Sequence, residues 1–246
     1  MSRARWLLGA AILTFLITLL LRLPLRWVSG HLPSGVQCTD AHGTLWHGGC
    51  GRLAVAQLGL GAARWQLHGL RLLAGRLSAE VETQRSALAI RGTLGRTIGG
   101  RITGEQLQLQ YALGSGLIPQ LPSLDGAVSA RFDELVIDGM RVDKVRGWLE
   151  ARDLVQVGTE RLALGSYRIE FDRPPAADGS ITGKVRDLGG PLDVQATLTL
   201  TGAPGYLLQG TVLARPEASA TLVRQISFLG SPDADGRRSF SQEASF

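Results

Sequence analysis

The sequence GRITGEQLQLQYAL, residues 100–113, alternates apolar and polar side chains over its second half. Leu107, Leu109 and Tyr111 fall on one side of an extended chain, and the glutamines between them fall on the other. An alternation with a period of two is typical of a β-strand with one buried face. The sequence LDVQATLTLTG, residues 192–202, repeats the pattern from residue 194 to residue 200. Both stretches therefore predict half-buried strands.

The same local theme recurs along the chain from about residue 41: a glycine, one residue, an apolar residue and a short alternating run. It is seen in CGRLAVAQL, AGRLSAEVET, DGAVSARFDELVID and LQGTVLA. The intervals vary from about 8 to 20 residues, so the chain is not a strict-period solenoid. Short strands without long helical periodicity predict a mainly β fold: an antiparallel meander, a sandwich or an open barrel.

One short helix is expected near the C-terminal end. RPEASATLVRQISFLG, residues 215–230, has apolar residues at helical spacing, a start at Pro216 and a C-cap at Gly230. No linker divides residues 29–246, which we expect to form one elongated β-rich domain. The loop Asp172–Ser180 is the best candidate for a hinge within it.

Residues 1–28 are expected to form a transmembrane anchor. WLLGAAILTFLITLLL, residues 6–21, carries no charge, and Trp6 and Trp27 bracket the segment about 31 Å apart as a helix. No small-x-small cleavage pattern follows, which favours an anchor over a signal peptide cut near Gly30. A long domain after a first apolar segment is normally exported. We therefore expect a single-pass protein of the bacterial inner membrane, with a cytoplasmic N-terminus and residues 29–246 in the periplasm.

The net charge of +5 comes largely from this N-terminal segment. Four of the 26 basic residues lie within residues 1–28, whereas all 21 acidic residues follow it. The remainder holds 22 basic and 21 acidic residues. A nucleic-acid-binding domain needs a basic patch on its folded surface, so this balance gives no support to nucleic acid as a partner.

The sequence contains no recognisable catalytic motif, and we expect a protein that is not an enzyme and has no cofactor. LGSGL, residues 113–117, does not match Gly-x-Ser-x-Gly, and no histidine follows His68. Asp133 and Glu134 are adjacent in a predicted strand and should point to opposite faces. A hydrolase of the periplasm is the weaker alternative, because no group of titratable residues converges.

Both cysteines lie in CTDAHGTLWHGGC, together with two histidines. The set Cys38, His42, His47 and Cys50 offers four possible zinc ligands, but its spacing matches none of the usual Cys-x2-4-Cys knuckles. An even number of cysteines in an oxidising compartment favours one disulfide, Cys38–Cys50, over a metal site or free thiols. Closing this loop would stabilise the fold by about 3 kcal/mol in the chain-entropy model.

Two further motifs resemble those of the type II secretion system protein N family. The first is Gly-Thr-Leu-Trp-x-Gly, shortly after the anchor. The second is Leu-Gly-x-Pro-Asp-x-x-Gly-Arg, after two Gly-ended strands and a helix at the C-terminal end. Their residues here are Gly43, Thr44, Leu45, Trp46 and Gly48, and Pro232, Asp233, Gly236 and Arg237. The Cys38/Cys50 pair is not part of the family pattern.

The resemblance implies a non-catalytic, inner-membrane accessory of the apparatus that moves folded proteins from the periplasm across the outer membrane. The implied partners are other inner-membrane components and the outer-membrane secretin. The family is also similar in fold to AsmA-like proteins, which form an open, curved β groove. That similarity suggests an alternative function: a groove of aliphatic side chains that binds or transfers lipid.

Overall fold

The computed structural model describes residues 11, 14, 15, 18, 22–25, 35–55, 58–69, 75–85, 87–115 and 123–245. Most of the predicted anchor, residues 1–28, lies outside these residues. No helix in the described part of the chain is long and apolar enough to cross a membrane.

The described domain is one antiparallel sheet with a short helix near the C-terminus, as predicted. The strands are β1 (Val36–Thr39), β2 (His42–Gly43), β3 (His47–Val55), β4 (Leu58–Leu67), β5 (Arg76–Arg85), β6 (Leu88–Thr97), β7 (Ile102–Leu113), β8 (Leu124–Asp138), β9 (Arg141–Val157), β10 (Arg161–Phe171), β11 (Ile181–Gly189), β12 (Leu192–Leu200), β13 (Gly205–Ala214) and β14 (Arg238–Ser245), and the helix is α4 (Ala220–Ser227).

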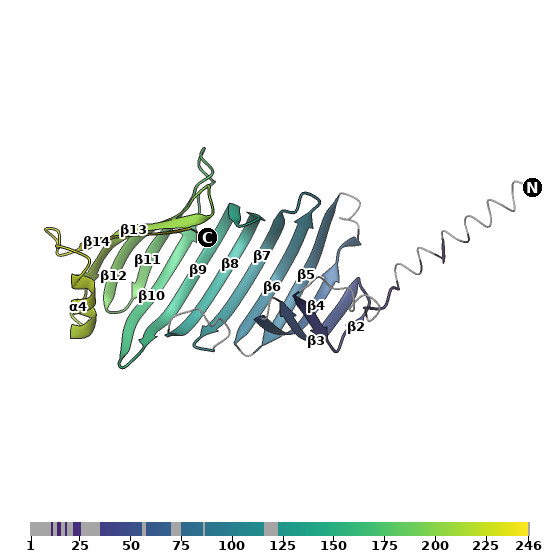
Figure 1. Ribbon diagram of the computed structural model, residues 1–246, viewed down its shortest axis with the longest axis horizontal. Helices are drawn as coiled ribbons and strands as arrows, with labels where there is room; N and C mark the ends of the chain where they lie inside the picture. The colour runs from purple at the N-terminus through teal and green to yellow at the C-terminus, as the bar shows by residue number, and fades with distance from the viewer. Residues whose placement is uncertain are drawn as a thin grey trace, which may run out of the picture.

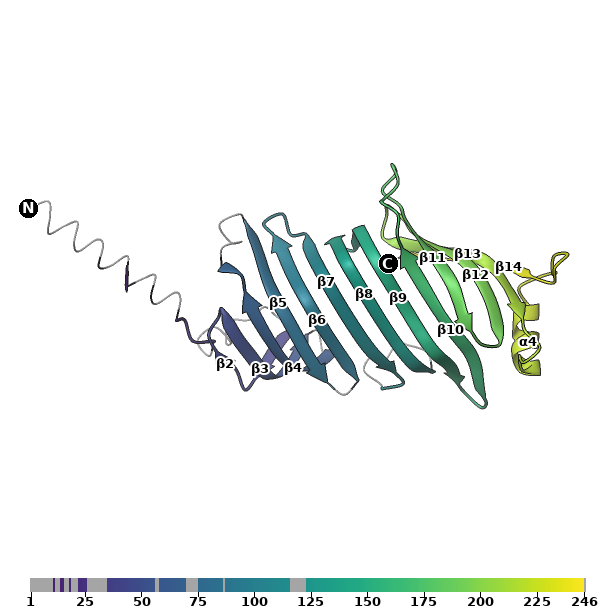
Figure 2. The same ribbon diagram turned by 180° about the vertical axis from the view of Figure 1, so that it is seen from behind.

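From β3 onward, the sheet is a meander in which each strand pairs with its neighbour in the sequence. The order runs β1-β3-β4 and onward to β14, with β2 paired to β3 beside this path. β1 and β14 are the two edges and do not pair with each other, so the sheet is open. Figures 1 and 2 show a single curved layer, with β2 and β3 near one end and α4 and β14 at the other. At about 4.8 Å per strand, the layer is roughly 60 Å long.

The register gives the sheet one apolar and one polar face, because directly paired residues share a face. One continuous row is apolar: Leu88, Tyr111, Val128, Ala151 and Tyr167. A neighbouring row on the other face is polar or amphipathic: Arg64, Glu82, Arg91, Gln108, Arg131, Trp148, Glu170 and Lys184. The alternation read from the sequence therefore extends across the strands as well as along them.

Bulges interrupt the longest strands and allow the sheet to curve. The register of β8 against β9 shifts between Phe132 and Glu134, opposite Gly147. Gly147 has a φ of 143°, and a Cβ at this position would collide with the backbone oxygen of Arg131. Only glycine fits such a position without strain. A bulge bends its strand and increases the local twist, so Gly147 helps to shape the concave side of the sheet.

The helix is shorter than predicted. α4 begins at Ala220 and not at Pro216, because the Ser219 side chain caps it by accepting a hydrogen bond from the Leu222 N–H at 3.2 Å. The preceding residues form a turn in which Ala218 N–H donates to Arg215 O at 2.9 Å. The predicted hinge loop, Asp172–Ser180, is the connection of the β10–β11 hairpin, and the sheet continues through it without a division.

Candidate functional site

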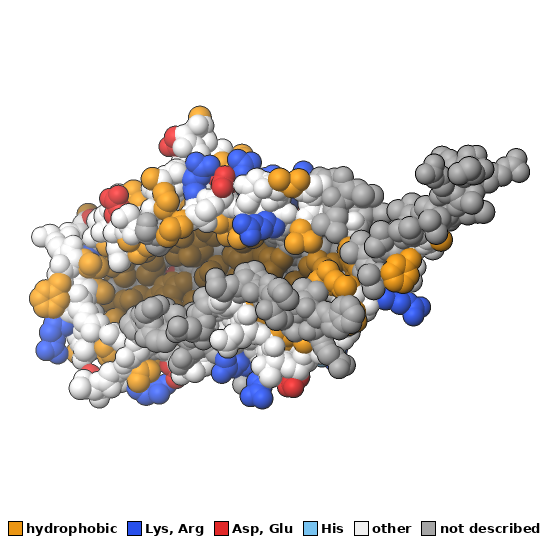
Figure 3. Space-filling model, turned by 45° about the vertical axis from the view of Figure 1, so that its right-hand side comes forward, with side chains coloured by type: hydrophobic (Ala, Val, Ile, Leu, Met, Phe, Trp, Pro, Cys, Tyr) orange, Lys and Arg blue, Asp and Glu red, His pale blue; other side chains and the backbone are white. Residues whose placement is uncertain are grey.

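The concave face of the sheet forms an apolar trough. Its floor contains three groups of buried side chains: Leu88, Tyr111 and Leu113; Val145, Phe171 and Ile181; and Leu192 and Val212, which are covered by Leu222 of α4. Figure 3 shows a hollow with a hydrophobic floor and charged side chains along its rims. The trough therefore follows the long axis of the sheet.

Much of the trough floor remains accessible. At one end α4 packs onto it, with Leu222 only 3% exposed against Leu192 and Val212. Elsewhere Leu109, Leu149 and Ile169 are half-buried. Burial of apolar surface contributes about 25 cal/mol per Å². A contiguous, accessible apolar surface of this kind is characteristic of a binding surface.

The trough also contains one polar cluster, which is paired internally. Tyr167 lies opposite Asp187 in the sheet, and its hydroxyl donates to Leu164 O. Arg215 contacts Asp187, whose side chain is 8% exposed, and donates through Nη1 to Gly190 O at 2.7 Å. Burial, followed by the charge of Asp187, raises the pKa of Tyr167 to about 12. These pairings satisfy the polar groups within an apolar surface.

The first family motif forms the tight β2–β3 hairpin. Gly43 has a φ of 84°, which favours glycine, and Thr44 N–H donates to His47 O at 2.9 Å. The Thr44 Oγ1 accepts from His47 N–H at 3.2 Å. A Cβ at Gly48 would lie 2.6 Å from Thr44 O, so glycine allows the two strands to approach closely. The motif is therefore explained by the geometry of one turn.

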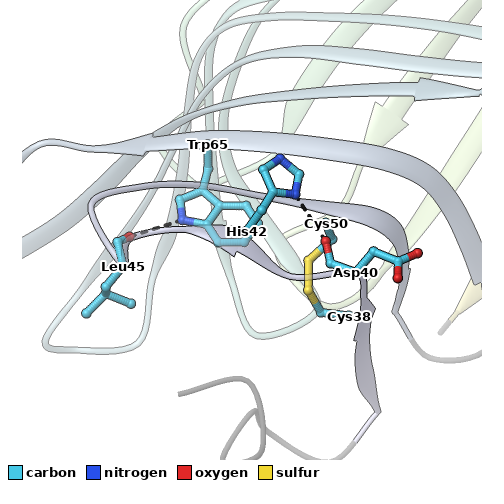
Figure 4. Close-up of a disulfide and its surroundings, with 6 residues drawn as sticks. All are labelled: Cys38, Asp40, His42, Leu45, Cys50 and Trp65. Atoms are coloured by element: carbon cyan, nitrogen blue, oxygen red, sulfur yellow. Dashed lines mark hydrogen bonds between the residues drawn. A yellow bond between two sulfur atoms is a disulfide. The ribbon is translucent and has the colours of Figure 1, made fainter. Parts of the chain in front are cut away.

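The remaining motif residues connect this hairpin to its surroundings. Leu45 O accepts from Trp65 Nε1 at 3.1 Å (Figure 4). Trp46 O accepts from Leu67 N–H at 2.8 Å. Leu45 N–H also donates to Leu23 O at 3.0 Å. The segment 22–25, which lies near the end of the predicted anchor, thus meets the motif, and its Pro24 forms a bridge with Thr44. Leu25 is buried.

Cys38 and Cys50 form a disulfide that joins β1 to β3, with their Cα atoms 5.5 Å apart (Figure 4). Their sulfurs are bonded to each other and are not available as thiolate ligands. His42 Nδ1 donates to Asp40 O at 3.0 Å. Within the described ranges, no group of three or more His, Cys, Asp and Glu side chains could hold a metal ion.

The second family motif fastens the last strand to the sheet. Pro232 precedes Asp233, whose Oδ1 accepts from Arg237 N–H at 2.8 Å, and Gly236 N–H donates to Asp233 O at 3.0 Å. The loop places Arg237 so that its Nη2 donates to Asp193 Oδ2 at 2.6 Å. Arg237 thereby links the entry to β14 with β12. The two motifs lie near opposite edges of one sheet.

Sequence reasoning missed several partners that hold these sites. Trp65 had no pattern to mark it, because its role depends on a contact with Leu45 twenty residues earlier. On the polar face, the guanidinium carbon of Arg168 lies 4.5 Å from the centroid of the Trp148 ring. Its Nη1 lies 3.5 Å from Oε2 of the buried Glu150. The alternation places these residues on one side of the strands, but only the register brings them together.

The comparisons with known proteins agree with the two motifs. Residues 34–241 match the family model for type II secretion system (T2SS) protein N. The chain belongs to the type II secretion system protein N family. A member from Aeromonas hydrophila is 29% identical over 241 residues, 92% of each chain. Another, from Vibrio cholerae serotype O1, is 27% identical over 243 residues, 86% of each chain. No solved structure gives a significant match.

Proposed function

We propose that this protein is a non-catalytic accessory component of the type II secretion apparatus, anchored in the inner membrane by residues 1–28. Residues 29–246 would lie in the periplasm. Family membership supports the role in secretion. The uncharged run at residues 6–21 supports the anchor. The Cys38–Cys50 disulfide fits an oxidising compartment.

The accessible apolar trough is the observation that carries this proposal. A scaffold needs a surface that its partners can bury, and half-buried apolar side chains such as Leu149 and Ile169 contribute to one. The polar cluster of Tyr167, Asp187 and Arg215 in the trough is already hydrogen-bonded within the protein, which leaves it better suited to a structural role than to catalysis. The proposed partners are inner-membrane secretion components and the outer-membrane secretin.

Photocrosslinking in intact secreting cells tests this assignment. A photoreactive residue at Leu149 or Ile169 reports on the trough, and one at Gln108 serves as the control on the polar face. We expect secretion components to be captured from the trough positions and not from Gln108. Capture of those components from Gln108 alone would refute the trough as the partner surface.

A lipid-binding trough is the second candidate, and the continuity of the apolar floor favours it. The row from Leu88 to Tyr167 crosses five strands without a charged residue. An acyl chain could lie along such a row, because it needs a continuous apolar path. Mass spectrometry of the purified full chain would detect bound phospholipid. Leu149→Glu should remove it, and Gln108→Glu should not.

A further inference from the structure

We propose that the β14 edge pairs with the β14 edge of a second copy of this chain, in antiparallel register about a two-fold axis at Gln242. The pairing would join two sheets into one continuous sheet. It requires neither of the functions proposed above, since it rests on the edge strand alone.

The outer edge of β14 has unused hydrogen-bonding capacity. β14 pairs with β13 along its whole length, from Arg238 opposite Val212 to Ser245 opposite Gly205. Within the described residues, no strand pairs with its other side. In an antiparallel ladder every second residue turns its N–H and C=O away from a given neighbour. The eight residues of β14 therefore offer about four such residues to an additional strand.

This edge lacks the features that usually block edge-to-edge pairing. Its register with β13 has no bulge, and residues 239–245 contain no proline or lysine and one charged residue, Glu243. The Arg238 side chain turns back to donate to Gly230 O. Exposed edge strands are commonly protected by charge, proline, bulges or short length. The opposite edge, β1, has four residues and is fastened by the disulfide.

The sequence of β14 is complementary to itself. Antiparallel pairing centred on Gln242 sets Phe240 opposite Ala244 of the second copy on the trough side. On the polar side it sets Ser241 opposite Glu243 and Ser239 opposite Ser245. A large apolar side chain thus meets a small one, and Glu243 meets a serine and not its own copy. Like charges directly opposite each other would be destabilising, and this register avoids them.

The faces of the two copies also match. Phe240 lies opposite Gly210 on the trough side and is half-buried beside α4. A two-fold axis perpendicular to the sheet leaves both apolar faces on the same side. The two troughs would therefore meet at β14. Phe228 and Leu229, 84% and 44% exposed, flank the start of this edge and would contact the C-terminal end of the second β14.

Cysteine crosslinking of the full chain in lipid nanodiscs tests the register. In an antiparallel pair, directly opposite Cα atoms lie about 4.5–5.5 Å apart, within the range that a disulfide spans. Gln242→Cys should form a disulfide-linked dimer on mild oxidation, and the native cysteines are already bonded to each other. Gln209→Cys, one strand further in on β13, is the matched control and should not crosslink.

Charge exchange at the axis tests the symmetry. Gln242→Lys places two lysines opposite each other, and Gln242→Glu two glutamates, so each variant alone should dimerise about tenfold more weakly than the wild type. A mixture of the two should recover dimers, while the far-UV circular dichroism of each variant alone stays that of the wild type, since each monomer is still folded. Sedimentation velocity measures these states.

Other outcomes would overturn the pairing. A wild-type chain that is monomeric at all accessible concentrations would do so. So would a Gln242→Cys adduct, formed in cells, that contains only a different protein, since it would assign the edge to a foreign strand. Failure of the lysine and glutamate variants to complement each other would refute the two-fold axis.

Discussion

Individual side-chain contacts stabilise this one-layer sheet, which has no second layer of strands or helices packed along its length in the described residues. Arg237, at the β14 edge, is one example. Its side chain is 18% exposed and donates a hydrogen bond to Asp193 on β12, two strands away. Such contacts replace packing energy that a thin sheet lacks, because few of its apolar residues are fully buried.

Replacing Arg237 should therefore loosen the end of the sheet. Arg237→Ala leaves Asp193 without its partner, and we expect a loss of about 1–2 kcal/mol in the free energy of unfolding. Arg131→Ala is the control, because Arg131 is 54% exposed and 3.7 Å from Asp133. An exposed pair of this kind contributes under about 1 kcal/mol. Urea denaturation measures the free energy of unfolding of both variants. Equal losses in the two would contradict the role of Arg237.

Tyr167 should make stability fall at alkaline pH. Its pKa is raised to about 12 by burial, whereas an unfolded tyrosine ionises near 10. Below pH 10 Tyr167 is protonated in both the folded and the unfolded protein, and its contribution to stability is fully present. Between pH 10 and 12 the unfolded state loses its proton first, so stability declines. Tyr167→Phe should flatten this decline in denaturation curves, although it removes the hydrogen bond to Leu164. An unchanged slope would contradict the assignment.

Gly147 should not tolerate a methyl group. Gly147→Ala combines a collision with Arg131 O and a φ of 143°, so we expect a loss of about 2 kcal/mol or more. Gly158 is the matched control, because a Cβ there would meet only Glu160 O, at 3.9 Å. Thermal unfolding of the two alanine variants compares them. If both variants had the same melting temperature, the bulge at Gly147 would not contribute to stability.

At the level of elements, each strand depends mainly on its immediate neighbours. The β1–β3 end is held by the disulfide and the Gly-Thr-Leu-Trp hairpin, and the β13–β14 end by the Pro-Asp-x-x-Gly-Arg loop. In such a meander a disturbance at one end should reach the other only through many intervening strands.

Removing the disulfide should accordingly have a local effect. The double variant Cys38→Ser, Cys50→Ser should lose about 3 kcal/mol, the value expected for a loop of this length. Hydrogen exchange should increase in β1 and β3 and stay unchanged in β13 and β14. Equal increases at both ends would show that the sheet unfolds as a single unit.

The sequence predicted elements better than it predicted their bounds or assembly. Strands with period-two alternation, such as residues 107–111 and 194–200, lie where they were expected. The start of α4 was misplaced by four residues, because a Ser219 cap outweighs a proline start. Alternation does not show whether an apolar face is covered, so the strand pattern fitted a meander, a sandwich or an open barrel, and only the family resemblance suggested an open, curved sheet. The contact between Trp65 and Leu45 depends on register and had no local signal.

For the whole molecule, the consequence of a single layer is that the native state exposes an apolar surface. The dye ANS should therefore bind the folded protein, which is unusual because ANS binding normally marks a partly unfolded state. Ile169→Gln on the trough floor should reduce the fluorescence. Gln108→Ala on the polar face should not change it. Equal fluorescence from all three proteins would mean that the dye binds elsewhere.

The meander has a consequence for how the protein is made. Every strand from β3 to β13 pairs with a strand that precedes it in the chain, so the sheet can grow one strand at a time as the polypeptide emerges on the periplasmic side of the membrane, in the topology proposed above. The Cys38–Cys50 bond can close after only the first strands have emerged and can provide a fixed starting template. Most of the connections between paired strands are short, and the longest, between β13 and β14, contains α4. Short loop closures favour rapid folding. The edge that is exposed at each moment is the one that the next strand will cover, and β14 is the last.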